Sequence, residues 1–323
     1  MKTLESENET SNVVKPVSIA ICVITCFRPD GLRRLLAGLA AQKFTKNTYP
    51  KMQIVIVDND AEGSARSICD EFTAKHNVKL QYDIEAQRGI PFARNRAVDM
   101  VKNNVDFIAI IDDDEVPAEN WLDELLAAQQ EFGADILTGP VIPHFMELTD
   151  PWLREFFGSG NLPNGHDLLH NYGYAYTSNL LGKAKLFQHI RFDDRFALIG
   201  AEDTHLFRQI FREGYKAVWA DNARVTEWLP ASRTNSKWLW KRAYSRGSRF
   251  ALSELIQDRT LKTRIQRIAK GSFRFVQGLA TAIVSVGRKT VFVRGVQTAC
   301  LGMGMITGSF GIEYQEYKTI HRV

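Results

Sequence analysis

The chain has 323 residues, of which 45% are hydrophobic and 24% are charged, a composition ordinary for a globular protein with a sizeable core. Its four cysteines lack the spacing of a zinc site, and they indicate reduced core residues of an intracellular protein instead of a disulfide framework. The polar start of the chain contains no apolar segment, so we expect a flexible tail over residues 1–16 and no signal peptide.

Charge is distributed unevenly along the chain. Residues 1–227 hold 24 Lys/Arg against 33 Asp/Glu, a net charge of −9, whereas residues 228–323 hold 17 against 4, a net charge of +13. A basic C-terminal part on an acidic body suggests contact with membrane headgroups, phosphates or nucleic acid. The alternative is a solvated basic helix face.

Strands and helices are expected to alternate over the first half of the chain. Apolar runs predict strands at 17–25, 52–60, 78–86 and 106–112. Helical spacing predicts helices at 30–42, 64–76 (capped by Ser64), 91–103 and 118–133. The second half is less regular, with strands expected within 134–145 and 174–187, a helix at 204–214 and one strand at 215–228. This order predicts an α/β fold with a mostly parallel sheet flanked by helices.

Four consecutive acids, Asp112 to Glu115, follow the apolar strand that begins at Phe107. Ligands bind beyond the carboxyl ends of strands in such sheets, and carboxylate oxygens suit Mg²⁺ or Mn²⁺. In an extended chain, Asp112 and Asp114 would project to the same side. The alternative is an acidic turn before a helix. The chain has neither G-x-G-x-x-G after the first strand nor a phosphate loop, which disfavours a dinucleotide-binding fold.

A second acidic pair, Glu202 and Asp203, stands at the start of the helix predicted at 204–214. A carboxylate in this place could take a proton from an attacking hydroxyl group. The alternative is a cap of that helix, which Asp203 or Thr204 could provide alone.

Six motifs occur together: "VSIAICVITCFRPDGLRRLL", "QIVIVDND", "RGIPFARNRAV", "FIAIIDDDEVPAENWLDELL", "TSNLLGKAKLF" and "GAEDTHLFRQIFREGYKAVW". This set resembles the inverting family 2 glycosyltransferases with a GT-A fold, and among them the bacterial exopolysaccharide enzymes of the succinoglycan type. The resemblance covers about residues 17–235. It implies a GT-A domain there, followed by a basic helical region over 236–323.

The resemblance implies that a UDP-sugar donor binds at the ends of the first strands. The residues that would hold it are Thr25, Phe27, Arg28, Asp58, Asn59, Arg94, Asn95, Asp112 and Asp113. It also implies that Asp114, with Asp112, holds Mg²⁺ or Mn²⁺. Asp203 would deprotonate the acceptor hydroxyl, and Glu202 would orient the acceptor or the base. The residues expected to face the acceptor are Thr177, Ser178, Asn179, Trp228 and Arg242.

One position departs from the family pattern. Relatives often carry a histidine in a "V-H-E-x-x-P" motif, where it can approach the metal or the diphosphate. This chain has "VTEWLP", with Thr226 in that place. Whether Glu227 or water takes over the role is left open.

The C-terminal segment 271–312 is apolar with sparse positive charges, and its longest uncharged run, Val296 to Ile312, has 17 residues. That length is marginal for a membrane span, so we expect an interfacial or re-entrant anchor attracted to anionic cytoplasmic lipids. The alternative is a helical hairpin packed on the catalytic domain or on a second copy, which leaves a homo-oligomer open.

The expected function is transfer of a sugar, glucose from UDP-glucose, to a lipid-linked or growing polysaccharide. The expected partners are the donor, a lipid-linked glycan and the cytoplasmic face of the membrane, with no nucleic acid. We therefore expect a cytoplasmic protein bound peripherally to that face. The alternatives are a sugar-nucleotide pyrophosphorylase, whose glycine-rich loop this chain lacks, and a non-enzymatic lipid- or nucleic-acid-binding protein.

Overall fold

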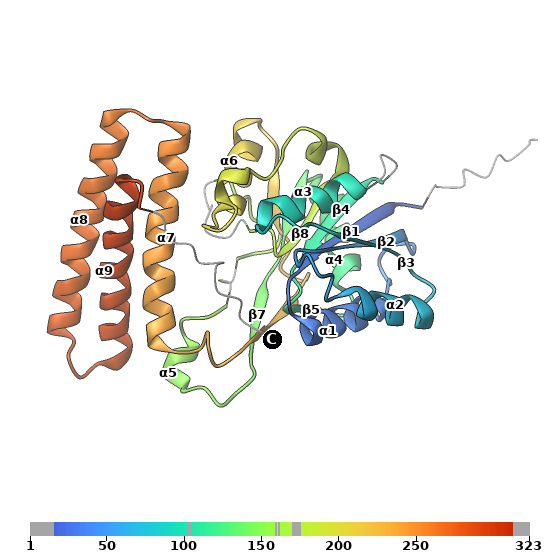
Figure 1. The fold of residues 1–323 in the computed structure, drawn as a ribbon, viewed down its shortest axis with the longest axis horizontal. Helices are drawn as coiled ribbons and strands as arrows, with labels where there is room; N and C mark the ends of the chain where they lie inside the picture. Colours follow the sequence, from blue (N-terminus) through green and yellow to red (C-terminus); the bar gives the residue numbers. More distant parts are fainter. Residues whose placement is uncertain (1–15, 102–104, 159, 161, 170–175, 313–323) are drawn as a thin grey trace, which may run out of the picture.

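The structure, a computed structural model, describes residues 16–101, 105–158, 160, 162–169 and 176–312. Figure 1 shows an α/β part with three long helices beside it. The tail expected over residues 1–16 lies almost entirely outside the described residues.

A seven-stranded sheet forms the centre of the α/β part, in the order β3-β2-β1-β4-β8-β6-β9. Its first four strands are parallel, and β8 is antiparallel to both of its neighbours. The prediction of a mixed, mostly parallel sheet is confirmed. The strands are β1 (Ser18–Thr25), β2 (Lys51–Asp58), β3 (Lys79–Ile84), β4 (Phe107–Ile111), β6 (Ile136–Thr138), β8 (Asn179–Lys183) and β9 (Ala217–Trp219).

Helices cover both faces of this sheet (Figure 1). One apolar core lies under α1, α2 and α4, and the other lies under α3 and α6. Both faces are buried, which explains why the parallel strands read as continuous apolar runs. These helices are α1 (Pro29–Ala40), α2 (Arg66–Lys75), α3 (Ile90–Met100), α4 (Trp121–Phe132) and α6 (Glu202–Arg212).

The elements predicted up to residue 133 are present, and their ends differ by at most three residues from prediction. Gly133 ends α4 in the left-handed conformation, with φ of 62°. The predicted cap at Ser64 is wrong. The residue before α2 is Ala65, whose side chain has no hydrogen-bonding group, and the carboxylates of Asp58 and Asp60 accept from the backbone N–H groups of Ala65 and Ser64.

A second sheet of three strands was missed by the sequence analysis. Its order is β5-β10-β7, with β5 (Glu115–Pro117) antiparallel to β10 (Val225–Leu229) and β7 (Val141–Phe145) parallel to it. The single strand predicted at 215–228 is wrong, because a turn at residues 220–224 divides it into β9 and β10. The division moves β10 next to the acidic segment after β4.

The three long helices are α7 (Ser236–Gln257), α8 (Leu261–Val284) and α9 (Lys289–Ser309), with α9 between the other two (Figure 1). Their backbones approach closely at glycines. A Cβ atom on Gly278 would lie 2.3 Å from the backbone nitrogen of Ala299. The short helix α5 (Pro151–Arg154) packs against α7 and α9 through an aromatic cluster. Among the described residues, no helix combines the length and apolar character that a membrane span requires.

Candidate active site

The acidic segment after β4 forms a tight turn. The backbone N–H of Glu115 donates to the carbonyl of Asp112 at 3.1 Å, and β5 begins at Glu115. The expectation of an extended chain with Asp112 and Asp114 on one side is therefore wrong. The glycine at position 31 allows α1 to pack closely on this turn, because a Cβ atom there would lie 2.5 Å from the carbonyl oxygen of Asp113.

Residues from the end of β1 hold the buried carboxylate of Asp113. The hydroxyl of Thr25 donates to it at 2.8 Å, and Nη1 of Arg28 donates to it at 2.7 Å. The same nitrogen lies 2.9 Å from the carboxylate of Asp114. Phe27, between these two residues, has φ of 55°, a strained conformation for a residue with a side chain. Three predicted donor-binding residues are thus brought to the acidic turn.

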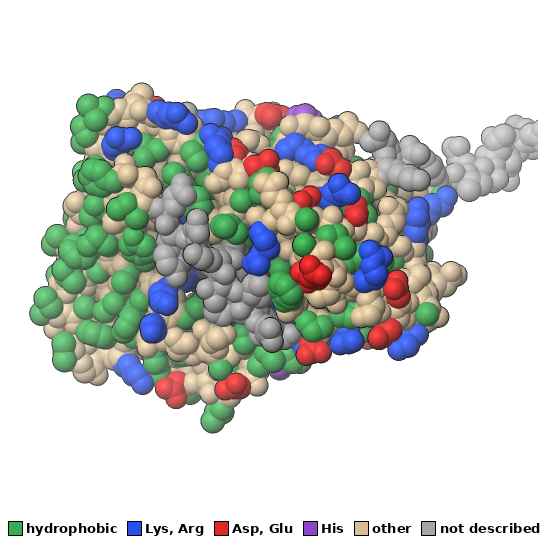
Figure 2. All heavy atoms as spheres, in the orientation of Figure 1, with side chains coloured by type: hydrophobic (Ala, Val, Ile, Leu, Met, Phe, Trp, Pro, Cys, Tyr) green, Lys and Arg blue, Asp and Glu red, His purple; other side chains and the backbone are tan. Residues whose placement is uncertain are grey.

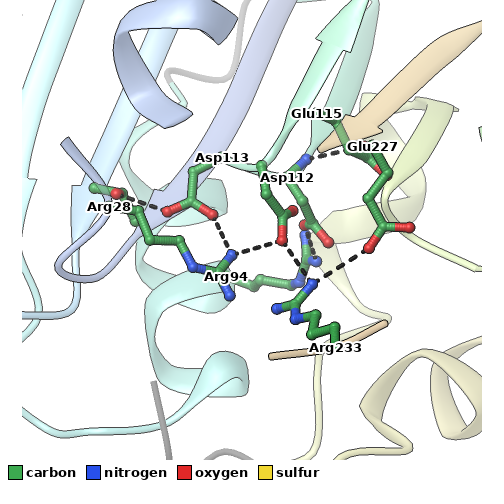
Figure 3. A network of polar contacts seen from close by, with 9 residues as sticks. Arg28, Arg94, Asp112, Asp113, Glu115, Glu227 and Arg233 are labelled. Atoms are coloured by element: carbon green, nitrogen blue, oxygen red, sulfur yellow. Dashed lines mark hydrogen bonds and ion pairs between the residues drawn. The ribbon is translucent and has the colours of Figure 1, made fainter. Parts of the chain in front are cut away.

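Arg233, in the segment between β10 and α7, closes the other side of the turn (Figure 3). Its Nη1 lies 3.0 Å from the carboxylate of Asp114 and 3.3 Å from that of Glu227. The backbone N–H of Trp228 donates to the carbonyl of Asp114. The small sheet therefore fixes the backbone of the turn, and the segment that follows it compensates the charge of the turn.

Arg94 reaches the turn from the first half of α3 (Figure 3). Its Nη2 donates to Asp112 at 2.7 Å, and its side chain is 5% exposed. Its Nε and Nη1 are buried and have no hydrogen-bond partner among the described residues. Buried guanidinium N–H groups are costly to leave unpaired, so these two atoms point to an anionic ligand near the start of α3.

The carboxyl groups of the turn differ in their protonation. Burial raises the pKa of Asp113 to about 6, although Arg28 opposes this. Burial also acts on Asp114, but Arg28 and Arg233 outweigh it and lower the pKa of that residue. Burial and three neighbouring carboxylates raise the pKa of Glu115 well above its ordinary value. Ionisation is therefore favoured at Asp114, between two arginines, and disfavoured at Glu115, among other carboxylates.

Glu202 and Asp203 form the first turn of α6, after two residues with left-handed backbone, Gly200 and Ala201. Glu202 is buried, and its Oε2 has no partner among the described residues. Burial and the charge of Asp203 raise the pKa of Glu202 to about 7, against the opposing effect of Arg94. Asp203 is only half-buried and accepts from the N–H of Thr204.

Three predicted donor-binding residues form hydrogen bonds with other parts of the protein. Asp58 is fully buried and accepts hydrogen bonds from the backbone of Asp60 and Ala65 and from the hydroxyl of Tyr82. The Asn59 amide binds the backbone of residues 85–89. The Asn95 amide binds the backbone of residue 192 through both its oxygen and its nitrogen. These contacts shape the loops around the site.

The predicted acceptor residues are dispersed. Asn179 is fully buried, and its amide binds Trp121 and two backbone carbonyl groups. Thr177 is buried and Ser178 half-buried beside it. Trp228 is half-buried, with the guanidinium of Arg34 at 4.4 Å from its ring centroid and a tilted histidine ring at 4.2 Å. Arg242, on α7, is exposed and stacks over a tryptophan ring.

Two arginines of the site were missed by the sequence analysis. Arg233 received no role, although it lies six residues after Glu227, whose charge it neutralises. Arg34 lies under the indole ring of Trp228, and its Nε and Nη2 have no partner among the described residues. Neither residue carries a strong local signal, because Asp114 and Trp228, which they contact, are distant from them in the chain.

Comparison with known proteins assigns this arrangement to a family. The family profile described as "Glycosyl transferase family 2" matches residues 20–194. The chain belongs to glycosyl transferase family 2. Among its relatives is the succinoglycan biosynthesis protein ExoM of Rhizobium meliloti, 29% identical over 74% of each chain. Another is a glucosyl-dolichyl phosphate glucuronosyltransferase of Haloferax volcanii, 24% identical over 72% of this chain and 75% of the relative.

Solved structures show the same fold at low sequence identity. The mannosyltransferase PcManGT from Pyrobaculum calidifontis, in complex with GDP-Man and Mn²⁺, aligns with a TM-score of 0.59 at 17% identity, over 89% of this chain and 86% of that one. TarS 1–349 of S. aureus aligns with a TM-score of 0.52 at 14% identity, over 89% and 90%. The predicted GT-A fold and family are thereby confirmed. The family match supports neither a pyrophosphorylase nor a non-enzymatic binding protein.

Proposed function

We propose that this family 2 glycosyltransferase transfers glucose from UDP-glucose to a lipid-linked or growing polysaccharide, with inversion at the anomeric carbon. The relationship to a succinoglycan biosynthesis protein supports a polysaccharide product. The complex of TarS with UDP-GlcNAc, on the same fold, supports a UDP-sugar donor. The enzyme would work at the cytoplasmic face of the membrane, where the lipid-linked acceptor is available.

The buried N–H groups of Arg94 carry this proposal. They are the unpaired donors of a guanidinium that already contacts Asp112 and whose charge acts on Glu202 and Asp203. A diphosphate placed at the start of α3 would satisfy them with charge-assisted hydrogen bonds. Thr25, Phe27 and Arg28 lie beside this position, at the end of β1, where the nucleoside would bind.

The acidic turn fits a divalent cation of the Mg²⁺ or Mn²⁺ type. Such ions need only one or two protein carboxylates, because water and substrate phosphates supply the other ligands. Asp112 and Asp114 would hold the ion, which supplies Lewis-acid stabilisation of the leaving diphosphate. Glu227 lies beside the proposed cation site, because its carboxylate and that of Asp114 contact the same nitrogen of Arg233. It is therefore a candidate for the role that the family histidine has at the position of Thr226. The contacts of Arg28 and Arg233 with Asp114 would have to loosen.

Asp203 would be the base. It would accept the proton of the acceptor hydroxyl, whose oxygen would bond to the anomeric carbon as the bond from that carbon to the UDP oxygen breaks. The raised pKa of Glu202 makes it a poorer base below pH 7 and a hydrogen-bond donor to a sugar oxygen. Thr177, Ser178 and Arg242 stay candidates for the acceptor side, whereas Asn179 and Trp228 would support them from within the fold.

The test is nucleotide release from a panel of UDP- and GDP-sugars, with Mn²⁺, Mg²⁺ or chelator, in the presence of membrane extract as acceptor. We expect turnover of UDP-glucose that depends on the metal and is lost in Asp203→Asn. Asp70→Asn, on the exposed side of α2, is the matched control and should keep full activity. Turnover of another donor alone would refute glucose as the transferred sugar. Full activity of Asp203→Asn would refute the assignment of Asp203 as the base.

A further inference from the structure

Large hydrophobic side chains are exposed mainly on the helical bundle. Among the described residues, eighteen such side chains are exposed, and twelve of them lie within residues 261–312. Figure 2 shows hydrophobic side chains gathered over the bundle, whereas charged side chains are spread over the α/β part. A concentration of this kind is unusual for a monomeric surface and indicates an interaction site.

Five of these residues form one continuous face, which we name the outer face of α8. They are Ile265, Phe273, Val276, Leu279 and Ile283, with exposed fractions of 56%, 69%, 64%, 43% and 72%. Their spacing repeats at helical intervals, so they share one side of α8 over about 27 Å of its length. The opposite side, with Gly271, Gly278 and Ala282, packs on α9.

The segment that carries this face is rich in cations, and the acids nearest to it, Glu254 and Asp258, stand before α8 begins. Residues 259–312 contain nine Lys/Arg and no Asp/Glu. Three of these cations form ion pairs with residues outside the segment. The other six form no ion pair with any described residue, and they are Arg259, Lys262, Arg264, Lys270, Arg274 and Arg288.

This charge decides between two occupants of the face. A second copy would bring the same cations of both chains together around a shared apolar contact, and no acid of the segment could compensate them. A bilayer with anionic headgroups offers an apolar layer for the five side chains and negative charge for the cations. The observed combination of an apolar face and surrounding cations is that of an interfacial helix.

We propose that the outer face of α8 binds the surface of an anionic phospholipid bilayer, with the helix lying in the plane of the interface. The helix is the layer of the bundle farthest from the central sheet (Figure 1). Binding through it would hold the enzyme at the bilayer that carries the proposed lipid-linked acceptor. That consequence rests on the proposed function, whereas membrane binding itself does not.

The test is co-sedimentation of the full-length protein with vesicles of phosphatidylcholine alone or of equal parts phosphatidylcholine and phosphatidylglycerol, at low and high salt. We expect the unchanged protein to bind the anionic vesicles, and this binding should weaken as salt is raised. The V276E/I283E variant should bind them with an affinity lower by a factor of about ten or more. The matched control is M146E/L148E, which adds two acids at exposed apolar positions of the α/β part and should bind like the unchanged protein.

Three outcomes would overturn the proposal. The first is equal binding of the V276E/I283E variant and the unchanged protein. The second is no binding of the unchanged protein to anionic vesicles. The third is a concentration-dependent dimer, seen by sedimentation, that V276E/I283E dissociates, which would assign the face to a second copy. Calorimetry of UDP binding by each variant tests the proposed function separately. The α8 substitutions should leave the affinity for UDP unchanged, so loss of vesicle binding alone says nothing against the glycosyltransferase.

Discussion

Replacing Glu202 with glutamine should change how the stability of the protein depends on pH. Glu202 is buried at the start of α6, and burial together with Asp203 raises the pKa of its carboxyl from 4.5 to about 7. Glutamine has nearly the same shape but never carries a charge. The substitution therefore removes the cost of ionising this buried group and leaves the packing of α6 in place.

The sign and size of the effect follow from proton linkage. Between pH 4.5 and about 7 the unfolded chain has lost the Glu202 proton while the folded chain retains it. The folded state thus binds more protons, and the free energy of unfolding falls as pH rises through this window. At about 1.36 kcal/mol for each pH unit, the loss approaches about 3 kcal/mol at pH 8. Glu202→Gln should therefore be about 3 kcal/mol more stable than the unchanged protein at pH 8 and about equal to it at pH 4.5.

The assay is urea unfolding of both proteins at intervals between pH 4.5 and 8, followed by circular dichroism. Glu71→Gln is the matched control, because Glu71 is exposed on α2, and its stability curve should run parallel to that of the unchanged protein. Parallel curves for Glu202→Gln as well would refute the reasoning, since they would mean that Glu202 titrates alike in the folded and unfolded states.

Three further substitutions test the site and its scaffold. Arg94→Lys keeps the charge but loses the fork that contacts Asp112, so calorimetry should show UDP affinity reduced by about 10- to 100-fold, and unchanged affinity would exclude Arg94 from the diphosphate site. Gly278→Val would drive a side chain into the backbone at Ala299, so urea unfolding should show a loss of about 3 kcal/mol, and full stability would contradict the close packing of α8 on α9. Asp123→Ala removes the carboxylate that accepts from the backbone N–H groups of residues 45–47. We expect the free energy of unfolding to fall by about 2 to 4 kcal/mol in urea. A fall of under about 0.5 kcal/mol would show that these N–H groups find other partners.

The first half of the fold could be predicted from sequence because its signals are local. Most of the parallel strands are short apolar runs between helices with clear spacing, and the acids after β4 directly follow that strand. The carboxyl ends of β1 and β2 meet in register at Thr25 and Asp58, as expected for parallel neighbours. The alternation of elements was therefore enough to place the acidic turn at the ligand-binding edge.

The remainder depends on contacts that no local pattern records. Residues 215–228 read as one strand, since nothing in their composition shows that the turn at 220–224 sends β10 into another sheet. Asn179, which follows two hydroxyl residues, was expected to face the acceptor, yet the fold buries it against Trp121 of α4. Arg233 could not be assigned because its partner Asp114 is 119 residues away.

The same separation explains why the site forms only in the complete fold. The acidic turn gathers negative charge in a buried place, which is costly unless cations compensate it. The compensating arginines come from three segments, with Arg28 85 residues and Arg94 18 residues from their carboxylate partners, and Arg233 farther still. Arg233 arrives only when β10 pairs with β5, which the turn itself begins. Pairing of the small sheet and compensation of the charge on the turn therefore occur together in the fold, and the proposed donor site depends on both.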